Sequence, residues 1–543
     1  MSRLFIFGID GASFELLQKW QNELPNLKKL KEKGVWGELE STFPPVTCPA
    51  WPAMFTGKNP AKLGMYDFLK YQADREQAFG LNTSLDYASS AVWTILNKHG
   101  KKVGLLNVAT TFPPQKIDSF LICGIGSPAL DALKASYTYP PELKKTLDEV
   151  VGGYEIIPLL EMLIPNIEEK CIKAFDELLK KREKAASYLM DNFPWDLFVC
   201  VFFALDSIQH YFWHHMDEKH IRQGKPKYRD VIKEFYIKVD GAIGRLLEKI
   251  PEDTNILVVS DHGFGPIHKW FAINRWLENN GFLKFKEKIH LSRTTHLLHQ
   301  TRNFFLAHLP QSMTRMIAKA LPRAITKKLA DLKTEKEDML SVYRSIDWSK
   351  TKAYGLGKVG MIYINLKGRE PGGIVEPGEE YERVRDEIIA KLKKIIDPET
   401  GRPVNIKVYK KEELYSGRYF KAAPDILYQM EKYYQTNSLR YKSEWGEPPF
   451  SGWHLREGIF IAHGPEIKES GERLEGLRIY DIAPTILHLF GLPIPKDADG
   501  RVLKEIFREE SEPASREVIY QEIDEEKERI RSKVRELKKL SRL

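Results

Sequence analysis

Residues 197–210 read LFVCVFFALDSIQH: an apolar run, Leu197 to Leu205, is followed directly by Asp206 and one helical turn later by His210. A continuous apolar run of this length is typical of a strand covered by helices on both faces, and it is far shorter than the roughly 20 apolar residues that cross a bilayer. The stretch therefore predicts a buried strand that delivers two polar side chains to its carboxyl end.

Similar short apolar runs recur along the chain, and helical patterns separate them. The runs lie at 4–9, 103–108, 256–259, 361–366 and 459–462, and the helical patterns at 25–33, 90–99, 170–192 and 228–249. Strands that alternate with helices predict an α/β fold around a large, mostly parallel central sheet flanked by helices. Sheets of this kind bind ligands at the carboxyl ends of their strands.

The composition is that of a folded protein of two to four domains: of 543 residues, 42% are hydrophobic and 29% are charged. The formal net charge of +8 favours anionic partners without indicating nucleic acid. Four cysteines without CxxC spacing argue against a disulfide framework or a thiolate metal site. Because MSRLFIFGID at the start lacks the pattern of a secretory signal, we expect a cytoplasmic protein.

Two helical stretches and a charged tail interrupt the alternation. We expect a catalytic core from residues 1–130, 196–270 and 346–510, a helical insertion at 131–195, a basic helical insertion or cap at 271–345, and a charged C-terminal helix at 511–543. The basic insertion suits either a cap packed on the core or an amphipathic surface for peripheral membrane contact, and we favour the cap. The mixed charges of the tail are typical of a solvated or homodimer-forming helix.

Six metal-capable side chains follow or flank the predicted strands. They are Asp10, Asp206, His210, Asp261, His262 and His454. Carboxylates and imidazoles are the ligands that borderline divalent cations prefer. Six of them suffice for two cations with three protein ligands each. Three aspartates leave such a pair with a net positive charge, which favours an anionic substrate group.

The stretch FPPVTCPAWPAMFTG, residues 43–57, adds a hydroxyl group at the start of a predicted helix. Thr47 there would lie near unpaired backbone N–H groups and the positive end of the helix dipole. A metal ion beside it would lower the pKa of the hydroxyl and yield an alkoxide nucleophile. The alternative role for such a threonine is a plain helix cap.

The order of these motifs resembles the alkaline phosphatase superfamily, in its type I phosphodiesterase/nucleotide pyrophosphatase branch. The resemblance rests on FGIDG at Asp10, VTCPAWPAMFTG at Thr47, LDSIQH at Asp206 and His210, SDHG at Asp261 and His262, GxH at His454 and DIAPTILHLFGLP at 481–493. It covers the three core segments. It implies an alkaline-phosphatase-like core and a metal-dependent hydrolase of phosphodiester or pyrophosphate bonds.

Carried over to this chain, the resemblance implies two divalent cations. Asp206, His210 and His454 would hold one, and Asp10, Asp261, His262 and the Thr47 oxygen the other. Zinc is the usual family metal, with manganese as the alternative. Thr47 would attack phosphorus and form a phospho-threonine intermediate. One departure concerns the substrate: members of the branch carry an asparagine downstream of the nucleophile, and Phe68 takes that place here.

Two alternatives stay open: a phosphomutase or phosphomonoesterase on the same core, and a non-catalytic metal-binding scaffold. A sulfatase is not indicated, because the residues after Cys48 lack the arginine-bearing sulfatase pattern. Four further residues lie near the motifs. We expect His214 and His215 at the helix surface or the site mouth, His268 to touch substrate or to pack, and Lys58 to meet a phosphate or stay exposed.

Overall fold

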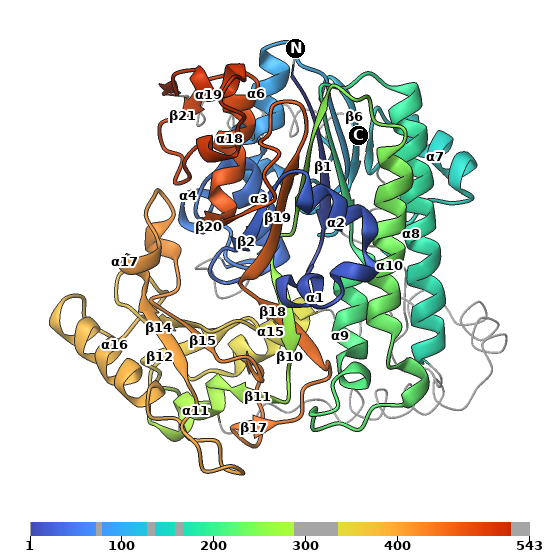
Figure 1. Cartoon of the computed structure of the whole chain (residues 1–543). Coiled ribbons are helices and arrows are strands. Elements are labelled where there is room, and N and C mark those ends of the chain that lie inside the picture. Colours follow the sequence, from blue (N-terminus) through green and yellow to red (C-terminus); the bar gives the residue numbers. More distant parts are fainter. Residues whose placement is uncertain (1, 72–78, 127–135, 158–166, 287–334, 523–543) are drawn as a thin grey trace, which may run out of the picture.

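A large sheet between two layers of helices dominates the computed structural model, which describes residues 2–71, 79–126, 136–157, 167–286 and 335–522 (Figure 1). Within these residues the sheet has nine strands. Their order across the sheet is β20 (Glu472–Arg478), β2 (Val35–Glu40), β19 (Glu457–His463), β9 (Thr254–Val259), β1 (Arg3–Ile9), β8 (Leu197–Phe202), β5 (Val103–Val108), β6 (Ser119–Cys123) and β7 (Thr138–Tyr139).

The centre of this sheet is parallel. Strand β1 lies between β8 and β9 and runs parallel to both, and β5 and β6 continue the parallel set. Strand β19 is antiparallel to its neighbours β2 and β9. Every residue of β5, β8 and β9 is buried, as expected for strands covered on both faces. The predicted α/β class with a mostly parallel central sheet is confirmed.

Helices cover both faces of the sheet (Figure 1). On one face lie α2 (Pro25–Glu32), α8 (Ile167–Asn192), α9 (Ala204–Met216) and α10 (Val231–Leu247), and on the other α3 (Thr47–Thr56), α6 (Val92–Lys98) and α18 (Ile482–Leu489). The helices predicted from sequence periodicity correspond to α2, α6, α8 and α10. None of the described helices is long and apolar enough to cross a membrane.

A second lobe has its own sheet and its own hydrophobic cluster. Its antiparallel sheet consists of β12 (Ala353–Leu356), β13 (Met361–Ile364), β15 (Ile426–Met430) and β14 (Ile406–Lys410), with α11 (Ile273–Asn279), α15 (Glu335–Ser345) and α16 (Glu379–Leu392) around it. The apolar run at 361–366, predicted as a core strand, forms β13 here, because an apolar run does not specify which sheet it joins. Residues 346–510 are therefore shared between the core and this lobe.

A short ribbon stands between the main sheet and the second lobe. Strand β10 (Gly263–Pro266) follows β9, and it pairs with β18 (Gly452–Leu455), which precedes β19. Beyond it, β11 (Lys269–Ala272) lies between β16 (Tyr434–Asn437) and β17 (Trp445–Gly446). The chain therefore crosses between the lobes next to the carboxyl end of β9.

The predicted strand at 197–205 is shorter than expected. Strand β8 ends at Phe202 and α9 begins at Ala204, so Asp206 lies in the first turn of a helix rather than at a strand end. Leu205 is buried in that first turn, and its apolar character extended the sequence pattern beyond the strand.

Parts of the predicted insertions and tail lie outside the described residues. These include 287–334 in the basic insertion and 523–543 in the tail. Residues 511–522 form the short helix α19 (Glu512–Ser515) and the strand β22 (Tyr520–Gln521), which pairs with β21 (Ile494–Pro495), so the charged helix does not begin at 511. In the 131–195 region, α8 packs its apolar residues into the main core.

Gly8 in β1 lets the indole of Trp51 lie against the sheet. A Cβ atom at Gly8 would come within 2.6 Å of the Trp51 ring and 2.9 Å of the Val201 side chain. Because both neighbours are buried in a close-packed core, neither can move away cheaply. We expect Gly8→Ala to lower the free energy of unfolding by about 1–3 kcal/mol, measured by urea denaturation.

Gly241→Ala is the matched control. This residue lies inside α10, where a Cβ would meet only the end of the Arg245 side chain at 3.3 Å. Helix propensity alone then raises the free energy of unfolding by about 0.5–1 kcal/mol. If Gly8→Ala left the free energy of unfolding unchanged or raised it as Gly241→Ala does, the close approach of Trp51 to β1 would not be a packing constraint.

Candidate metal centre

The seven candidate residues converge at one edge of the main sheet. Asp10 follows β1, Asp206 and His210 lie on α9 after β8, Asp261 and His262 follow β9, His454 lies on β18, and Thr47 is the first residue of α3. Because β8, β1 and β9 are parallel neighbours, their carboxyl ends meet. Short polar contacts connect all seven side chains at this edge.

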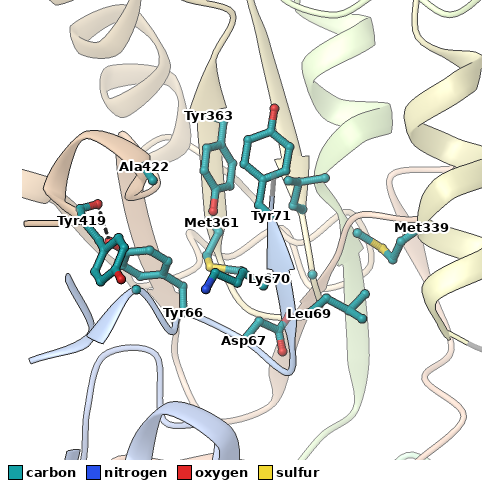
Figure 2. Close-up of a pocket in the computed structure, with 13 residues that line it drawn as sticks. Tyr66, Asp67, Leu69, Lys70, Tyr71, Met339, Met361, Tyr363, Tyr419 and Ala422 are labelled. Atoms are coloured by element: carbon teal, nitrogen blue, oxygen red, sulfur yellow. Dashed lines mark hydrogen bonds between the residues drawn. The ribbon is translucent and has the colours of Figure 1, made fainter. Parts of the chain in front are cut away.

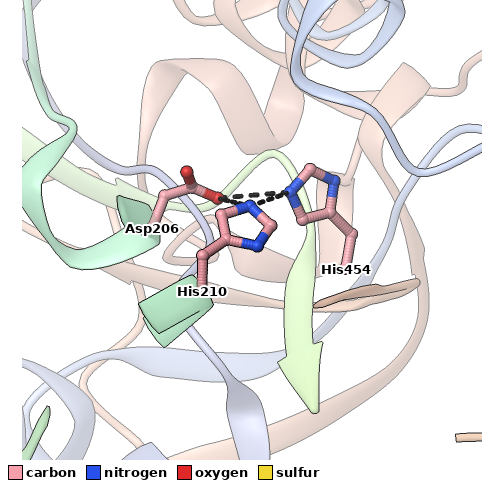
Figure 3. A group of neighbouring side chains, drawn as sticks. All are labelled: Asp206, His210 and His454. Carbon is pink, nitrogen blue, oxygen red and sulfur yellow. Dashed lines mark hydrogen bonds and ion pairs between the residues drawn. The ribbon is translucent and has the colours of Figure 1, made fainter. Parts of the chain in front are cut away.

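Asp206, His210 and His454 form the first group (Figure 3). The Oδ1 atom of Asp206 lies 3.3 Å from Nε2 of His454 and 3.6 Å from Nε2 of His210. The two Nε2 atoms lie 3.0 Å from each other. Figure 3 shows the carboxylate and both rings pointing toward one point.

The hydrogen bonds of the two imidazoles fix their tautomers. Nδ1 of His210 donates to the backbone carbonyl of Gly452 at 2.9 Å, and Nδ1 of His454 donates to that of Pro45 at 3.1 Å. Burial lowers the pKa of His210 to about 4 and also lowers the pKa of His454 well below its usual range, so both rings are neutral at neutral pH. Two Nε2 lone pairs then face each other and a carboxylate oxygen, which is an arrangement that a bound cation satisfies.

Asp10, Asp206 and His262 form the second group, so Asp206 belongs to both. Nε2 of His262 lies 3.8 Å from Oδ1 of Asp10, 3.3 Å from Oδ2 of Asp261 and 3.2 Å from Oγ1 of Thr47. Nδ1 of His262 donates to the carbonyl of Gly263, which again leaves Nε2 as the acceptor. The Thr47 hydroxyl therefore lies next to this group, in contact with His262.

The three carboxylates carry unbalanced negative charge. Asp10 and Asp261 are fully buried and Asp206 is nearly so, and within the described residues none of them pairs with lysine or arginine. Burial, followed by repulsion from neighbouring carboxylates, raises the pKa of Asp10 and of Asp261. One oxygen of each aspartate has no hydrogen-bond partner. Buried, unpartnered oxygens beside imidazole lone pairs fit divalent cations.

Trp51 supports the site and was not predicted. Its Nε1 donates to Oδ2 of Asp10 at 2.9 Å. It stands four residues after Thr47 on α3, hence on the same side of the helix, and this spacing is the signal in the sequence that could have identified it. The indole fixes one Asp10 oxygen and leaves the other directed at His262.

Two hydrogen bonds that the sequence analysis did not predict hold the loop after β1 in place. The backbone N–H of Gly11 donates to Oδ1 of Asp261 at 3.2 Å, and Nε2 of Gln209 donates to the Gly11 carbonyl at 2.8 Å. Gly11 has φ of 68°, and a Cβ there would lie 3.2 Å from Oδ1 of Asp206. The left-handed turn at a glycine thus lets the Asp206 carboxylate approach this loop closely.

The other residues near the motifs have structural contacts. Lys58, expected either exposed or at a phosphate, is buried and pairs with Asp497 at 2.7 Å, because the segment around 497–499 packs over the end of α3. Phe68 packs between the two hydrophobic clusters. Burial raises the pKa of the Cys48 thiol, which therefore stays neutral beside Thr47.

His214, His215 and His268 lie in a histidine group beyond the metal centre. The rings of His214 and His215 are 3.8 Å apart, and His220 links the group to His268, with 4.6 Å between their ring centroids. Burial lowers the pKa of His268 to about 4. This group contributes no atom to the two clusters of metal-capable side chains found in the described residues.

Comparison with known proteins identifies related sequences. The family model described as type I phosphodiesterase / nucleotide pyrophosphatase matches residues 4–454. Ectonucleotide pyrophosphatase/phosphodiesterase family member 3 of Bos taurus is 29% identical over 107 residues, which cover 19% of this chain and 12% of the bovine protein. The Mus musculus protein of the same name is 30% identical over 92 residues, 17% of this chain and 10% of its own length. The match thus spans about a tenth of these relatives.

Solved structures share the fold at low sequence identity. Human ectonucleotide pyrophosphatase / phosphodiesterase 5 superposes with a TM-score of 0.50 and 14% identity, over 93% of this chain and 100% of the human one. An inactive form of the murine protein in complex with AMP gives a TM-score of 0.51 at 14% identity, over 94% and 100% of the chains. The large sheet with its helical layers is therefore the fold of these proteins.

Trp51→Phe tests the role of the indole N–H. Removing this donor leaves the Asp10 oxygen unpaired and free to rotate, so we expect zinc affinity to fall about 10- to 100-fold. Titration with a competing chelator measures it. Trp93→Phe is the control, since Trp93 is equally buried but donates to Gln115. Equal zinc affinity in both variants would show that the Trp51 N–H does not support the candidate metal centre.

Proposed function

The chain belongs to the type I phosphodiesterase/nucleotide pyrophosphatase family, and from this premise we propose that it is a metal-dependent hydrolase of phosphodiester or pyrophosphate bonds with Thr47 as nucleophile. One observation carries the proposal. The Thr47 hydroxyl lies 3.2 Å from Nε2 of His262, within a cluster whose three buried carboxylates have no lysine or arginine partner among the described residues. Such a cluster suits cations and an anionic substrate.

The start of α3 is suited to hold a phosphoryl group. Val46 before it is extended, with φ of −125° and ψ of 136°, and no side chain caps the helix. Pro49 has no N–H and the Ala50 N–H donates to the Val46 carbonyl, so the backbone N–H groups of Thr47 and Cys48 are the ones without a partner in the helix that can donate to phosphoryl oxygens. These N–H groups can take the role of the asparagine that other members of the branch carry and that Phe68 replaces in this chain.

The reaction has two displacements. Thr47 Oγ1 loses its proton and forms a bond to phosphorus while the bond to the leaving oxygen breaks on the opposite side, and the leaving alkoxide takes up a proton. Because Thr47 contacts His262 of the second group, we assign the leaving oxygen to the first group, Asp206, His210 and His454. Water then displaces Thr47 from the phospho-threonine and releases the phosphate product. Divalent cations, when bound, lower the pKa of the attacking hydroxyl and neutralise charge on the entering and leaving oxygens. The donor set of carboxylates and imidazoles suits zinc, with manganese as the alternative.

Thr47→Ala tests the nucleophile with bis(4-nitrophenyl) phosphate as substrate. We expect kcat/KM to fall by at least about 1,000-fold, because no attacking oxygen is left, while Thr47→Ser keeps part of the activity. Thr56→Ala is the control: Thr56 lies at the other end of α3, and its hydroxyl donates to the Pro52 carbonyl. Undiminished turnover by Thr47→Ala with unchanged metal content would contradict the assignment.

Metal removal distinguishes a metal-dependent hydrolase from a non-catalytic metal-binding scaffold. Dialysis against a chelator should abolish hydrolysis, and zinc or manganese should restore it, because the buried carboxylates then regain their counter-charge. Comparison of bis-aryl with mono-aryl phosphate distinguishes a diesterase from a monoesterase or mutase. Absence of bound metal by elemental analysis, together with absence of turnover on either ester, would instead favour the non-catalytic scaffold.

A further inference from the structure

A cleft between the two lobes lies directly beside the first group of the metal centre. The core contributes Pro45, Trp453 and His454 to its walls. The second lobe contributes the turn between β12 and β13, residues 358–360, and Gln435 of β16. His454 thus belongs both to the candidate metal centre and to the wall of this cleft.

Trp453 provides the aromatic surface at this junction. It stands next to His454 on β18 and is half-buried. Its ring is stacked on His454 with 4.9 Å between centroids and 11° between planes, and it lies 5.0 Å from His210. Phe450 stacks beside it at 6.0 Å. Trp453 therefore packs against both imidazoles and, as a half-buried residue, also lines the cleft.

The proposed chemistry determines which part of a substrate meets Trp453. Displacement is in line, so the leaving oxygen lies across phosphorus from Thr47. Because Thr47 contacts His262 of the second group, we assign the leaving oxygen to the first group, Asp206, His210 and His454. The group bonded to that oxygen must continue away from the buried carboxylates. Within the described part of the chain, His454 lines a cleft that Trp453 also lines, and we take this cleft as the path of the leaving group.

A second cavity, of about 130 Å³, lies on the other side of the turn between β12 and β13 (Figure 2). It is lined by Tyr66, Tyr71, Tyr363 and Tyr419, among others. Figure 2 shows these rings around Lys70 and Met361. None of the seven candidate site residues lines this cavity, so the leaving group is assigned to the cleft instead.

We infer that Trp453 is a specificity-determining residue which stacks on the leaving group of the substrate. This inference rests on the proposed function and narrows it to phosphodiesters whose leaving alcohol carries a flat aromatic or heterocyclic ring. A half-buried indole in the cleft wall gains stacking and burial energy from such a ring, whereas a small aliphatic alcohol covers less of it.

The test compares two diesters that share the transferred methylphosphoryl group, one with a 4-nitrophenyl and one with a trifluoroethyl leaving group. We expect Trp453→Ala and Trp453→Leu to lower kcat/KM for the aryl ester about 5- to 100-fold, and that for the alkyl ester less than about 3-fold. Trp453→Phe should recover most of the aryl activity. Trp270→Ala removes another half-buried tryptophan, which packs against Tyr441 with 4.5 Å between ring centroids and does not line the cleft, and it should change neither.

A binding measurement makes the result independent of turnover. In the Thr47→Ala background, calorimetric titration with bis(4-nitrophenyl) phosphate should give weaker binding when Trp453 is replaced by Leu, with metal content unchanged. Equal losses for both esters, or unchanged calorimetric affinity, would overturn the stacking role and leave the hydrolase proposal standing. Turnover that does not depend on Thr47 would overturn the proposed function, and the calorimetric comparison would still decide the role of Trp453.

Discussion

The mutual repulsion of Asp10, Asp206 and Asp261 is the constraint around which this molecule is organised. Three parallel strands bring these carboxylates to one buried edge, and within the described residues neither lysine nor arginine pairs with them. Burying uncompensated charge is costly, so the folded chain gains stability from any cation that binds there. Because Asp206 belongs to both ligand groups, the loading of one position changes the charge felt by the other.

The two lobes contribute different parts of the proposed site: the core carries the candidate catalytic residues, and the second lobe forms part of the cleft wall. The ends of the main-sheet strands, the helices α3 and α9, and the ribbon strand β18 supply every candidate ligand and Thr47. The second lobe supplies the opposite wall of the cleft beside His454. The sheet of the second lobe packs in its own hydrophobic cluster, so residues of this lobe can change without disturbing the packing of the core. Such changes would alter the wall of the cleft, and with it the preferred leaving group, while the candidate catalytic residues stay the same.

The sequence predicted the fold class and the residues that meet at the site, because strand ends, helix starts and metal-capable side chains leave local patterns. It did not place β13 in a separate sheet, since an apolar run looks the same in either sheet. The support of Asp10 by Trp51 was missed because it is a tertiary contact. The role of Trp453 depends on a cleft formed by distant segments, which no local pattern encodes.

The imidazoles of His210 and His454 are oriented by carbonyl groups of the main chain, at Gly452 and Pro45. A backbone acceptor survives most amino-acid replacements, whereas a side-chain acceptor is lost with its residue. Neighbouring positions can therefore change over generations without releasing these rings. Such a site is robust to genetic drift while its surroundings diversify, which makes the scaffold a favourable starting point for evolving new substrate preferences in the laboratory.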